Sequence, residues 1–503
     1  MAKRHRGRRW LPWVGLAASL LVIAVVAVVV VVSGREGDVS NPGADFRQTE
    51  TQAASSHGAV QKPPKLGHPS DDGFKWPLFG YNLQRTRVLG LKRLFRPPFR
   101  VAWRMNAHQL LEFSPVLCQR SVYLLGDSGV LFKISRWTGQ VEWRRKLGDL
   151  AASSPACSDG IVYSVLLRAP GSSTGRIVAL STDFGHVRWS HPLPARAESS
   201  PLLDHGHLYF GTEDGSVYAL NAHSGHLLWR TRTSGAVKGS LALANGKLYF
   251  GTYGGAVYAL RQSNGHVVWR AAVASGGAFG LGGGNFYATP AIEYGRVYIG
   301  ATNGAIYSLV ARTGRLAWRK QTGNYVYASA AVGAVAGGRP TVWVGSYNGT
   351  FYALDARSGA VRWTRALGGK LSGSATVLGD LVFVSSFDRR TTWAVGANTG
   401  KVVWRWPRGA FTPAISDGRR IYFNGFGSLY GLDPKGEQYA KRARPRGVPG
   451  LSAQKQRAAA KRQRAAAAKR RAAARRRAAA KRRAAAAKRA RGRTCRRHPK
   501  RCH

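Results

Sequence analysis

The sequence predicts an all-β fold, an eight-bladed β-propeller, and three observations support this prediction. Tryptophans recur at intervals of 40 to 49 residues through the middle of the chain. Each repeat unit contains an apolar pair such as Leu208-Tyr209 and a polar glycine turn such as Asp214-Gly215. The composition, with Gly 61, Trp 15 and Tyr 19 beside only Met 2, fits short strands joined by tight turns.

The repeat units read as three or four short strands joined by hairpin turns. One such unit cannot bury both of its faces, whereas a radial arrangement lets neighbouring blades cover each other. We therefore expect the indole side chains of the repeat to fill the space between blades. The repeat tryptophans are Trp103, Trp143, Trp189, Trp229, Trp269, Trp318, Trp363 and Trp404.

The number of blades follows from the way in which the two ends of the repeat region match. The last unit begins at Ala410 and ends near Asp433 without a tryptophan strand of its own. The segment from Phe99 to Trp103 has the sequence of such a strand and precedes the first complete unit. Pairing the two predicts an eighth blade that closes the ring and removes its exposed sheet edges.

Residues 10–32 form an uncharged, apolar run of 23 residues. As a helix the run is roughly 34 Å long, enough to cross a hydrocarbon core of about 30 Å. Residues 1–9 carry 5 basic residues, so the positive-inside rule places the N-terminus in the cytoplasm. The run is longer than a signal-peptide core and no small-x-small site follows it, although cleavage stays the alternative. We expect a single-pass signal anchor in the cell membrane, with the rest of the chain extracytoplasmic.

The remaining segments divide the chain by composition. Residues 33–74, rich in Ser, Gly, Pro and Gln, predict a flexible stalk. Residues 75–440 contain the propeller, and residues 441–503 form a basic, low-complexity tail. Of the formal charge of +54, the tail contributes 26 and residues 1–9 contribute 5, which leaves 23 on the middle of the chain.

The tail alternates alanine blocks with basic clusters. Alanine favours a helix, whereas like charges four residues apart oppose it, so the tail is expected to be helical or disordered. Because we expect the tail to be extracytoplasmic, its positive charge predicts binding to an anionic cell-surface polymer or lipid. The alternative is that the tail is a solvated, disordered segment without a ligand. It has no aromatic residue and no base-reading motif, so nucleic acid is not expected. The expected binding residues are Lys461, Arg462, Lys469, Arg470, Arg471, Arg475, Arg476, Arg477, Lys481, Arg482 and Arg483.

The chain has four cysteines, Cys118, Cys157, Cys495 and Cys502. Cys118 and Cys157 lie at nearly matching positions of successive repeat units, whereas the other two lie in the tail. An even number outside the cytoplasm permits two disulfides, but the sequence does not assign the pairing. Buried thiols in the propeller, with an incidental pair in the tail, are an equal alternative.

The units closely resemble the pyrroloquinoline-quinone-like (PQQ-like) propeller repeat, a strand followed by an acidic or small residue, a Thr-Gly-type turn and a terminal Trp. The stretch from Tyr352 to Trp363 is the best copy, and Trp76 to Asn82 is similar to the lead-in of such domains. The resemblance covers about 75–439. It implies either a quinoprotein dehydrogenase or a non-catalytic scaffold such as the BamB-type outer-membrane assembly lipoproteins.

The resemblance to the dehydrogenase branch would imply a quinone in the central funnel, a calcium ion held by oxygen ligands, and a catalytic Asp. This chain has no adjacent cysteines and only about 17 acidic residues between 75 and 440. The Asp of the repeat is replaced in four blades by Asn221, Arg261, Val310 and Gly396. We therefore expect no catalytic, cofactor-binding or metal-binding residue and no cofactor.

The leading functional interpretation is a membrane-anchored, non-catalytic scaffold that binds envelope proteins or peptides at the loop face of its propeller. A PQQ-dependent dehydrogenase is one alternative. A binder of envelope polyanions or glycans through the basic tail is the other. The sequence does not indicate which face of the propeller binds.

Overall fold

A computed structural model describes residues 37–47, 76–91, 93–272, 284–411 and 414–435. The chain divides into two compact units, Met1–Glu437 and Gln438–His503, and the second contains no described residue. No helix within the described ranges is long and apolar enough to cross a membrane. The predicted anchor and the predicted polyanion-binding residues of the tail, Lys461 to Arg483, lie outside the described residues.

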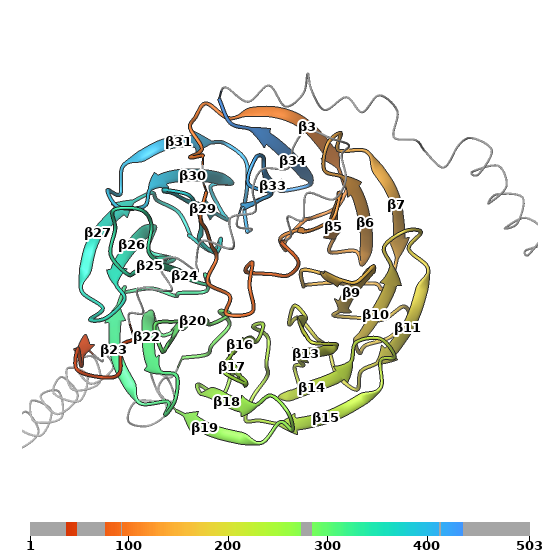
Figure 1. Cartoon of the computed structure of the whole chain (residues 1–503), viewed down its shortest axis with the longest axis horizontal. Helices are drawn as coiled ribbons and strands as arrows, with labels where there is room; N and C mark the ends of the chain where they lie inside the picture. The colour runs from red at the N-terminus through yellow and green to blue at the C-terminus, as the bar shows by residue number, and fades with distance from the viewer. Residues whose placement is uncertain (1–36, 48–75, 92, 273–283, 412–413, 436–503) are drawn as a thin grey trace, which may run out of the picture. The chain divides into compact units, whose positions relative to one another are not determined.

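Eight antiparallel sheets are arranged radially around a central axis, which confirms the predicted eight-bladed β-propeller (Figure 1). Each blade has four strands, and the innermost strand is the shortest because neighbouring blades converge at the axis. Strands follow from alternating and β-branched apolar residues, and glycine-containing turns separate them. Apolar cores lie between adjacent blades; Val116 of blade 1, for example, shares one with Val178 of blade 2.

The first four blades are contiguous in sequence and run from the axis outward. Blade 1 consists of β4 (Val116–Cys118), β5 (Ser121–Leu125), β6 (Val130–Ser135) and β7 (Val141–Lys146). Blade 2 consists of β8 (Ala156–Ser158), β9 (Ile161–Leu166), β10 (Arg176–Ser181) and β11 (Val187–Pro192). Blade 3 consists of β12 (Leu202–Asp204), β13 (His207–Gly211), β14 (Ser216–Asn221) and β15 (Leu227–Arg232). Blade 4 consists of β16 (Ala242–Ala244), β17 (Lys247–Gly251), β18 (Val257–Arg261) and β19 (Val267–Ala271).

Three further contiguous blades and one composite blade complete the ring. Blade 5 consists of β20 (Ala291–Glu293), β21 (Arg296–Gly300), β22 (Ala305–Val310) and β23 (Leu316–Gln321). Blade 6 consists of β24 (Ala331–Gly333), β25 (Thr341–Gly345), β26 (Thr350–Asp355) and β27 (Val361–Ala366). Blade 7 consists of β28 (Thr376–Leu378), β29 (Leu381–Ser386), β30 (Thr391–Gly396) and β31 (Val402–Trp406). Blade 8 consists of β32 (Ile415–Ser416), β33 (Ile421–Gly425), β34 (Ser428–Asp433) and, from the N-terminal side, β3 (Arg100–Asn106).

The composite blade closes the ring as the sequence predicted. Strand β3 pairs antiparallel with β34, so that Val101 faces Leu432 and Arg104 faces Tyr430. The register shifts between Val101 and Trp103, and every other outer strand has the same irregularity beside its repeat tryptophan. The isolated strand therefore has the geometry of an outer strand.

The structure places all eight repeat tryptophans on the outermost strand of a blade. In seven of them the indole N–H donates to a main-chain carbonyl of the next blade at 2.9 to 3.1 Å. Glycine in that blade's outer turn makes the contact possible: a Cβ on Gly225 (φ 74°) would lie 2.6 Å from Cε3 of Trp189. The exception is Trp404, because blade 8 has no continuous outer turn; the ring of Phe99 packs there instead, with centroids 5.0 Å apart.

A disulfide joins Cys118 of β4 to Cys157 of β8, with 6.4 Å between the Cα atoms. The sequence left this pairing open. Cys118 is the last residue of β4 and Cys157 is the middle residue of β8, and the convergence of the two blades at the axis brings them within disulfide range. The bond therefore links two neighbouring blades near the axis.

The prediction of a flexible stalk is wrong for residues 37–47. Strand β1 (Val39–Ser40) pairs antiparallel with β23 at the rim of blade 5, where Figure 1 shows it outside the ring. Arg296 donates to the carbonyl oxygens of Ala44 and Asp45. The ring of Phe46 stacks on Tyr294 with centroids 5.3 Å apart. The polar composition of residues 37–47 does not indicate this contact. Most of its hydrogen bonds involve main-chain groups, which every sequence has.

Candidate functional site

One face of the propeller carries two sets of connections from every blade. The loops from each outer strand to the next inner strand lie on the same face as the turns between second and third strands, because successive strands are antiparallel. We call this the funnel face. Its loops surround the central axis, the usual place for ligands and partners in folds whose rigid strands position variable loops.

The segment Trp76–Leu89 closes the centre of the ring beneath the funnel face. Figure 1 shows it crossing the middle of the propeller. It bonds to the inner strands of six blades through the carbonyl oxygens of Trp76, Pro77, Leu83, Gln84, Thr86 and Arg87. Strand β2 (Val88–Leu89) then pairs in parallel with β28 of blade 7. The lead-in therefore forms the floor of a funnel that is closed at the axis.

Two arginines of this floor are fully buried. The guanidinium of Arg85 donates to the carbonyl oxygens of Leu241 and Pro201, at 2.8 and 3.4 Å. Arg87 donates to Ala330 O at 3.2 Å. Burial lowers the pKa of Arg87 to about 9, and burial together with the charge of Arg87 holds the pKa of Arg85 well below its ordinary value. No carboxylate within the described ranges pairs with either, so main-chain carbonyl dipoles provide their stabilisation.

Above the floor, a belt of hydroxyl groups links the blades around the axis. The hydroxyl of Ser200 accepts a hydrogen bond from the backbone N–H of Ser154 at 2.9 Å, and the same contact recurs from blade to blade as far as Ser374. Between Ser114 and Ser154 the two hydroxyl groups bond to each other instead, at 3.1 Å. The belt consists of Ser114, Ser154, Ser200, Ser240, Thr289, Ser329 and Ser374. Because the belt fixes the loop backbone in each blade, the residue two positions earlier occupies an equivalent place at the mouth of the funnel.

Four acidic side chains, Glu112, Asp127, Glu198 and Glu213, stand at the mouth on blades 1 and 3; we call them the mouth carboxylates. Lys238 lies between two of them, with Nζ 2.8 Å from Oε1 of Glu198 and 2.8 Å from Oε1 of Glu213. All three of these side chains are about four-fifths or more buried. In a chain whose formal charge is +54, this is a local concentration of negative charge.

Burial shifts the protonation of the mouth carboxylates. Burial and the charges of Asp127 and Glu198 raise the pKa of Glu112 to about 7. Burial raises the pKa of Asp127 to about 6, although the backbone N–H of Glu112 opposes the change. Burial lowers the pKa of Lys238, but its bonds to Glu198 and Glu213 outweigh this and raise it overall. The mouth therefore gains negative charge as the pH rises through about 6 to 7.

Five tyrosines continue the mouth on blades 4 to 6; we call them the tyrosine arc. Their ring centroids lie 5.0 to 6.3 Å apart in successive pairs. The ammonium of Lys238 lies 5.4 Å from the first ring of the arc, and that of Lys370 lies 5.9 Å from the last. The arc consists of Tyr253, Tyr287, Tyr325, Tyr327 and Tyr347, of which Tyr325 is half exposed. Apolar faces and hydroxyl groups thus line the mouth beside the carboxylates.

The acidic and aromatic parts of the mouth are in electrostatic contact. Burial and the charges of Glu198 and Glu112 hold the pKa of Tyr287 well above its ordinary value. Side chains from blades 1, 3 and 5 therefore converge on one region, although they are far apart in the sequence. The sequence patterns singled out none of these residues; the Ser or Thr that follows Glu112, Glu198 and Tyr287 by two residues is the signal that could have found those three.

The residues at the mouth do not fit the calcium and quinone site that the dehydrogenase branch requires. The described part of the chain contains no group of three or more His, Cys, Asp and Glu side chains that could hold a metal ion. Calcium needs several clustered oxygen ligands, whereas Lys238 already engages Glu198 and Glu213. We therefore derive no step through such a group.

Comparison with known proteins places the repeat in a family. The family model described as "Outer membrane protein assembly factor BamB" matches residues 127–333 and 306–485, more than half of the chain. The chain belongs to this family. A curated member, the outer membrane protein assembly factor BamB of Burkholderia pseudomallei, is 35% identical over 104 residues, which are 20% of this chain. The alignment spans a quarter of that relative's length.

Solved structures share the fold of this BamB-family chain. BamB from Moraxella catarrhalis matches with a TM-score of 0.56 and 17% identity over 67% of this chain and 99% of that one. The quinohemoprotein alcohol dehydrogenase ADHIIG from Pseudomonas putida matches with a TM-score of 0.60 and 14% identity over 78% and 83%. At these identities the similarity establishes the propeller fold, which scaffolds and dehydrogenases share.

Proposed function

We propose that this protein is a membrane-anchored, extracytoplasmic scaffold whose funnel face binds a segment of an envelope protein without catalysing a reaction. Membership of the BamB family, named for an outer membrane protein assembly factor, supports a role in the envelope. The mouth carboxylates and the tyrosine arc support a protein partner. The predicted anchor at residues 10–32 would hold the propeller at the membrane.

The juxtaposition of acidic and aromatic side chains above a closed floor carries this proposal. Tyrosine provides a large contact area with little loss of conformational entropy and is enriched at protein interfaces. The neighbouring carboxylates can pair with lysine or arginine side chains of a partner, because two cations, Lys238 and Arg196, pair directly with these four acidic groups. A closed floor limits ligands to the surface of the mouth, which suits a peptide segment that lies across it.

Site-specific photo-crosslinking in intact cells tests the proposal. We expect a photoreactive residue at Tyr325 to capture an envelope protein, because this side chain is half exposed within the arc. The matched control is the same residue at Leu227, which is half exposed on the outer strand of blade 3. Capture at Leu227 but not at Tyr325 would contradict binding at the funnel face.

A quinoprotein dehydrogenase is the second candidate, favoured by the shared fold. The europium-containing methanol dehydrogenase matches with a TM-score of 0.60 and 13% identity over 73% of this chain. Purified full-length protein would be assayed for bound quinone and for calcium-dependent or lanthanide-dependent dye reduction. A bound quinone with dye reduction would replace the scaffold proposal with this one.

A binder of envelope polyanions is the third candidate, favoured by the 26 basic residues of 441–503. Counterion release would make such binding weaken steeply with salt. A chain truncated after Tyr439 would then be lost from isolated cell envelopes at low salt, whereas the full chain would stay bound. Equal retention of both chains would refute a tethering role for the tail.

A further inference from the structure

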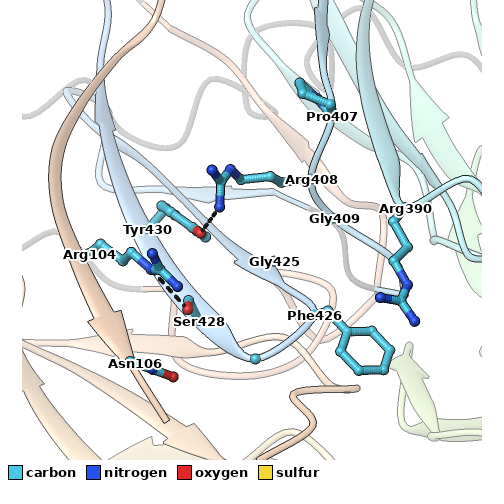
Figure 2. Close-up of a pocket in the computed structure, with 11 residues that line it drawn as sticks. Arg104, Asn106, Arg390, Pro407, Arg408, Gly409, Gly425, Phe426, Ser428 and Tyr430 are labelled. Carbon is cyan, nitrogen blue, oxygen red and sulfur yellow. Dashed lines mark hydrogen bonds between the residues drawn. The ribbon is translucent and has the colours of Figure 1, made fainter. Parts of the chain in front are cut away.

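A cleft separates blades 7 and 8 on the funnel face, away from the mouth carboxylates. Its volume is about 270 Å³, and three arginines, Arg104, Arg390 and Arg408, line it. Figure 2 shows Arg104 and Arg408 beside Tyr430, and Arg390 beside Phe426. We call it the arginine cleft. Its wall comes from both ends of the propeller, because Arg104 lies on β3 and Tyr430 lies on β34.

Neutral groups hold two of the arginines in place. Arg408 donates from Nη1 to the hydroxyl of Tyr430 at 2.8 Å, and Arg104 donates from Nε to Oγ of Ser428 at 3.1 Å (Figure 2). Both guanidinium groups lie 5.6 Å from the centre of the Tyr430 ring, which is itself buried. A guanidinium has five N–H donors, so most of those in the cleft stay available.

Arg390 stands on the other side of the cleft. Its guanidinium lies 4.1 Å from the centre of the Phe426 ring, and the ring is two-fifths exposed. Stacking on an aromatic face orients the planar guanidinium without using its hydrogen-bond donors. The cleft therefore presents donors from a second direction.

No carboxylate among the described residues pairs with any of these three arginines. Arg420, which lies just before β33 in blade 8, differs from these three arginines because it has an acidic partner. Its buried guanidinium binds Asp433 in two contacts, at 2.6 and 3.2 Å. Arg420 is thus paired with an acid, and Arg85 and Arg87 are bound by main-chain carbonyl groups, whereas the arginines of the cleft line an open space. Like charges held together repel, and an anion between them relieves that repulsion.

Glycines keep the cleft open. Gly409 has a φ of 110°, and a Cβ there would lie 2.0 Å from Oγ1 of Thr392. A Cβ on Gly425 would lie 2.8 Å from Cε2 of Tyr430. The loops of blades 7 and 8 can therefore approach the arginines closely without filling the space between them.

We propose that the arginine cleft binds the phosphate group of a phosphorylated small molecule, lipid headgroup or polymer end. Three guanidiniums that converge from two sides match a tetrahedral oxyanion better than a planar carboxylate, and their forked donors match phosphate geometry. The ring of Phe426 adds an apolar wall for the organic part of the ligand. The proposal does not depend on the protein partner at the mouth.

Binding at this cleft stabilises the closed ring, because β3 and β34 both contribute to it. A ligand that binds the folded state alone raises the melting temperature, and the gain in stability grows with the logarithm of one plus the ratio of ligand concentration to Kd. Phosphate attracted to the 26 basic residues of the tail has no such effect, because the tail offers the same charges when the propeller is unfolded. Thermal stabilisation therefore distinguishes the cleft from general attraction to a basic chain.

The test is thermal unfolding of the full-length, detergent-solubilised protein in 150 mM sodium chloride with four probes. They are inorganic phosphate, glycerol 3-phosphate, a short-chain phosphatidylglycerol and sulfate. We expect phosphate-bearing probes to raise the melting temperature with the logarithmic concentration dependence of binding to the folded state, which gives an apparent Kd. The probe with the lowest apparent Kd identifies the source: free phosphate, a small phosphoester or a lipid headgroup. Equal effects of sulfate and phosphate would overturn selectivity for phosphate and leave a simple oxyanion site.

Variants assign the effect to the cleft. We expect Arg408→Ala and Arg390→Ala each to raise the apparent Kd by at least tenfold. Arg408→Lys, which keeps the charge but loses the fork, should give a smaller increase. The matched control is Arg144→Ala, which removes the same charge from an exposed site on the outer strand of blade 1. The proposal is wrong if no probe stabilises the protein, or if the cleft variants and Arg144→Ala respond equally.

Discussion

The mouth carboxylates and the arginine cleft occupy the same face and are built from the same kinds of loop, yet they carry opposite charge. At the mouth, burial raises the pKa of Glu112 to about 7 and Lys238 partly compensates the acidic charges. In the cleft, aromatic rings and hydroxyl groups hold three arginines that face no described acid. Repeated backbone geometry therefore fixes where a loop side chain stands, whereas its chemistry is free to vary from blade to blade.

This difference in charge makes the two sides of the funnel face chemically distinct. A partner that carries cationic and aromatic side chains is drawn to blades 1 to 6, and a phosphate group is drawn to blades 7 and 8. Complementary charge contributes more to orientation and specificity than to affinity. The two regions can therefore act on different ligands or on two ends of one partner.

Of the changes that test the difference between the two regions, adding a methyl group at Gly409 in the wall of the arginine cleft should have the largest effect on stability. We expect Gly409→Ala to lower the free energy of unfolding by roughly 3 kcal/mol, because a methyl group would overlap Thr392 and the positive φ disfavours a side chain. Gly246→Ala, at φ 66° with nothing within 4 Å, should cost only about 1 kcal/mol. Chemical denaturation measures both, and equal losses would contradict a tight cleft wall.

Removing the cation at the mouth should have the next largest effect. We expect Lys238→Met to lower the free energy of unfolding by about 2 kcal/mol at pH 8, because the buried carboxylate of Glu198 would lose its cation and face Glu213, which would keep Arg196 alone. At pH 5 most of this loss should disappear as Glu198, whose pKa is raised by burial, gains a proton. Lys370→Met removes a lysine from the same face without breaking such a pair, and a comparable loss there would refute the explanation.

The acidic region should also destabilise the fold as the pH rises. The pKa of Glu112 is about 7 when folded and lies near 4.5 when unfolded, so the folded state binds the proton more tightly. Its contribution to stability is complete below about pH 4.5 and is lost as the pH rises through 7. Glu112→Gln should flatten this dependence by ~1 to 2 kcal/mol between pH 5 and pH 8. An unchanged slope in denaturation at the two pH values would count against the raised pKa.

The smallest effect on stability should come from the tyrosine arc. Tyr325 is half exposed, so Tyr325→Ala should change the free energy of unfolding by less than about 0.5 kcal/mol. The same substitution should reduce co-purification of the partner captured by crosslinking at the mouth. Tyr209→Ala, which removes a buried tyrosine from a blade core, should instead destabilise the fold by several kcal/mol. Undiminished co-purification with Tyr325→Ala would place the partner elsewhere.

The sequence predicts the fold well because the blade signal is local and repeated. Trp363 and the turn before it lie within one short stretch, and eight such stretches specify the ring. Even the closing strand is recognisable, because the residues around Trp103 repeat the pattern of the other outer strands. The contact between residues 37–47 and blade 5 is not recognisable, because no side-chain periodicity marks the few residues of β1.

The candidate site is harder to predict because each loop contributes one or two residues. Glu112 and Glu198 lie two blades apart, and only the ring brings their charges together. The cleft is still more dispersed, since Arg104 and Arg408 come from opposite ends of the propeller. In the sequence each is an isolated charge; their proximity depends on the strand pairing that closes blade 8.

That closing sheet also sets the order of events during biosynthesis. Arg104 and Ser428 are 324 residues apart, so β3, the first blade strand to leave the ribosome, must wait for nearly the whole repeat region to follow. Until β34 arrives, the nascent chain carries an outer strand without a partner in its own sheet, and such an edge is prone to mispairing. Completion of the toroid is therefore a late step, reached after synthesis of the repeats rather than blade by blade.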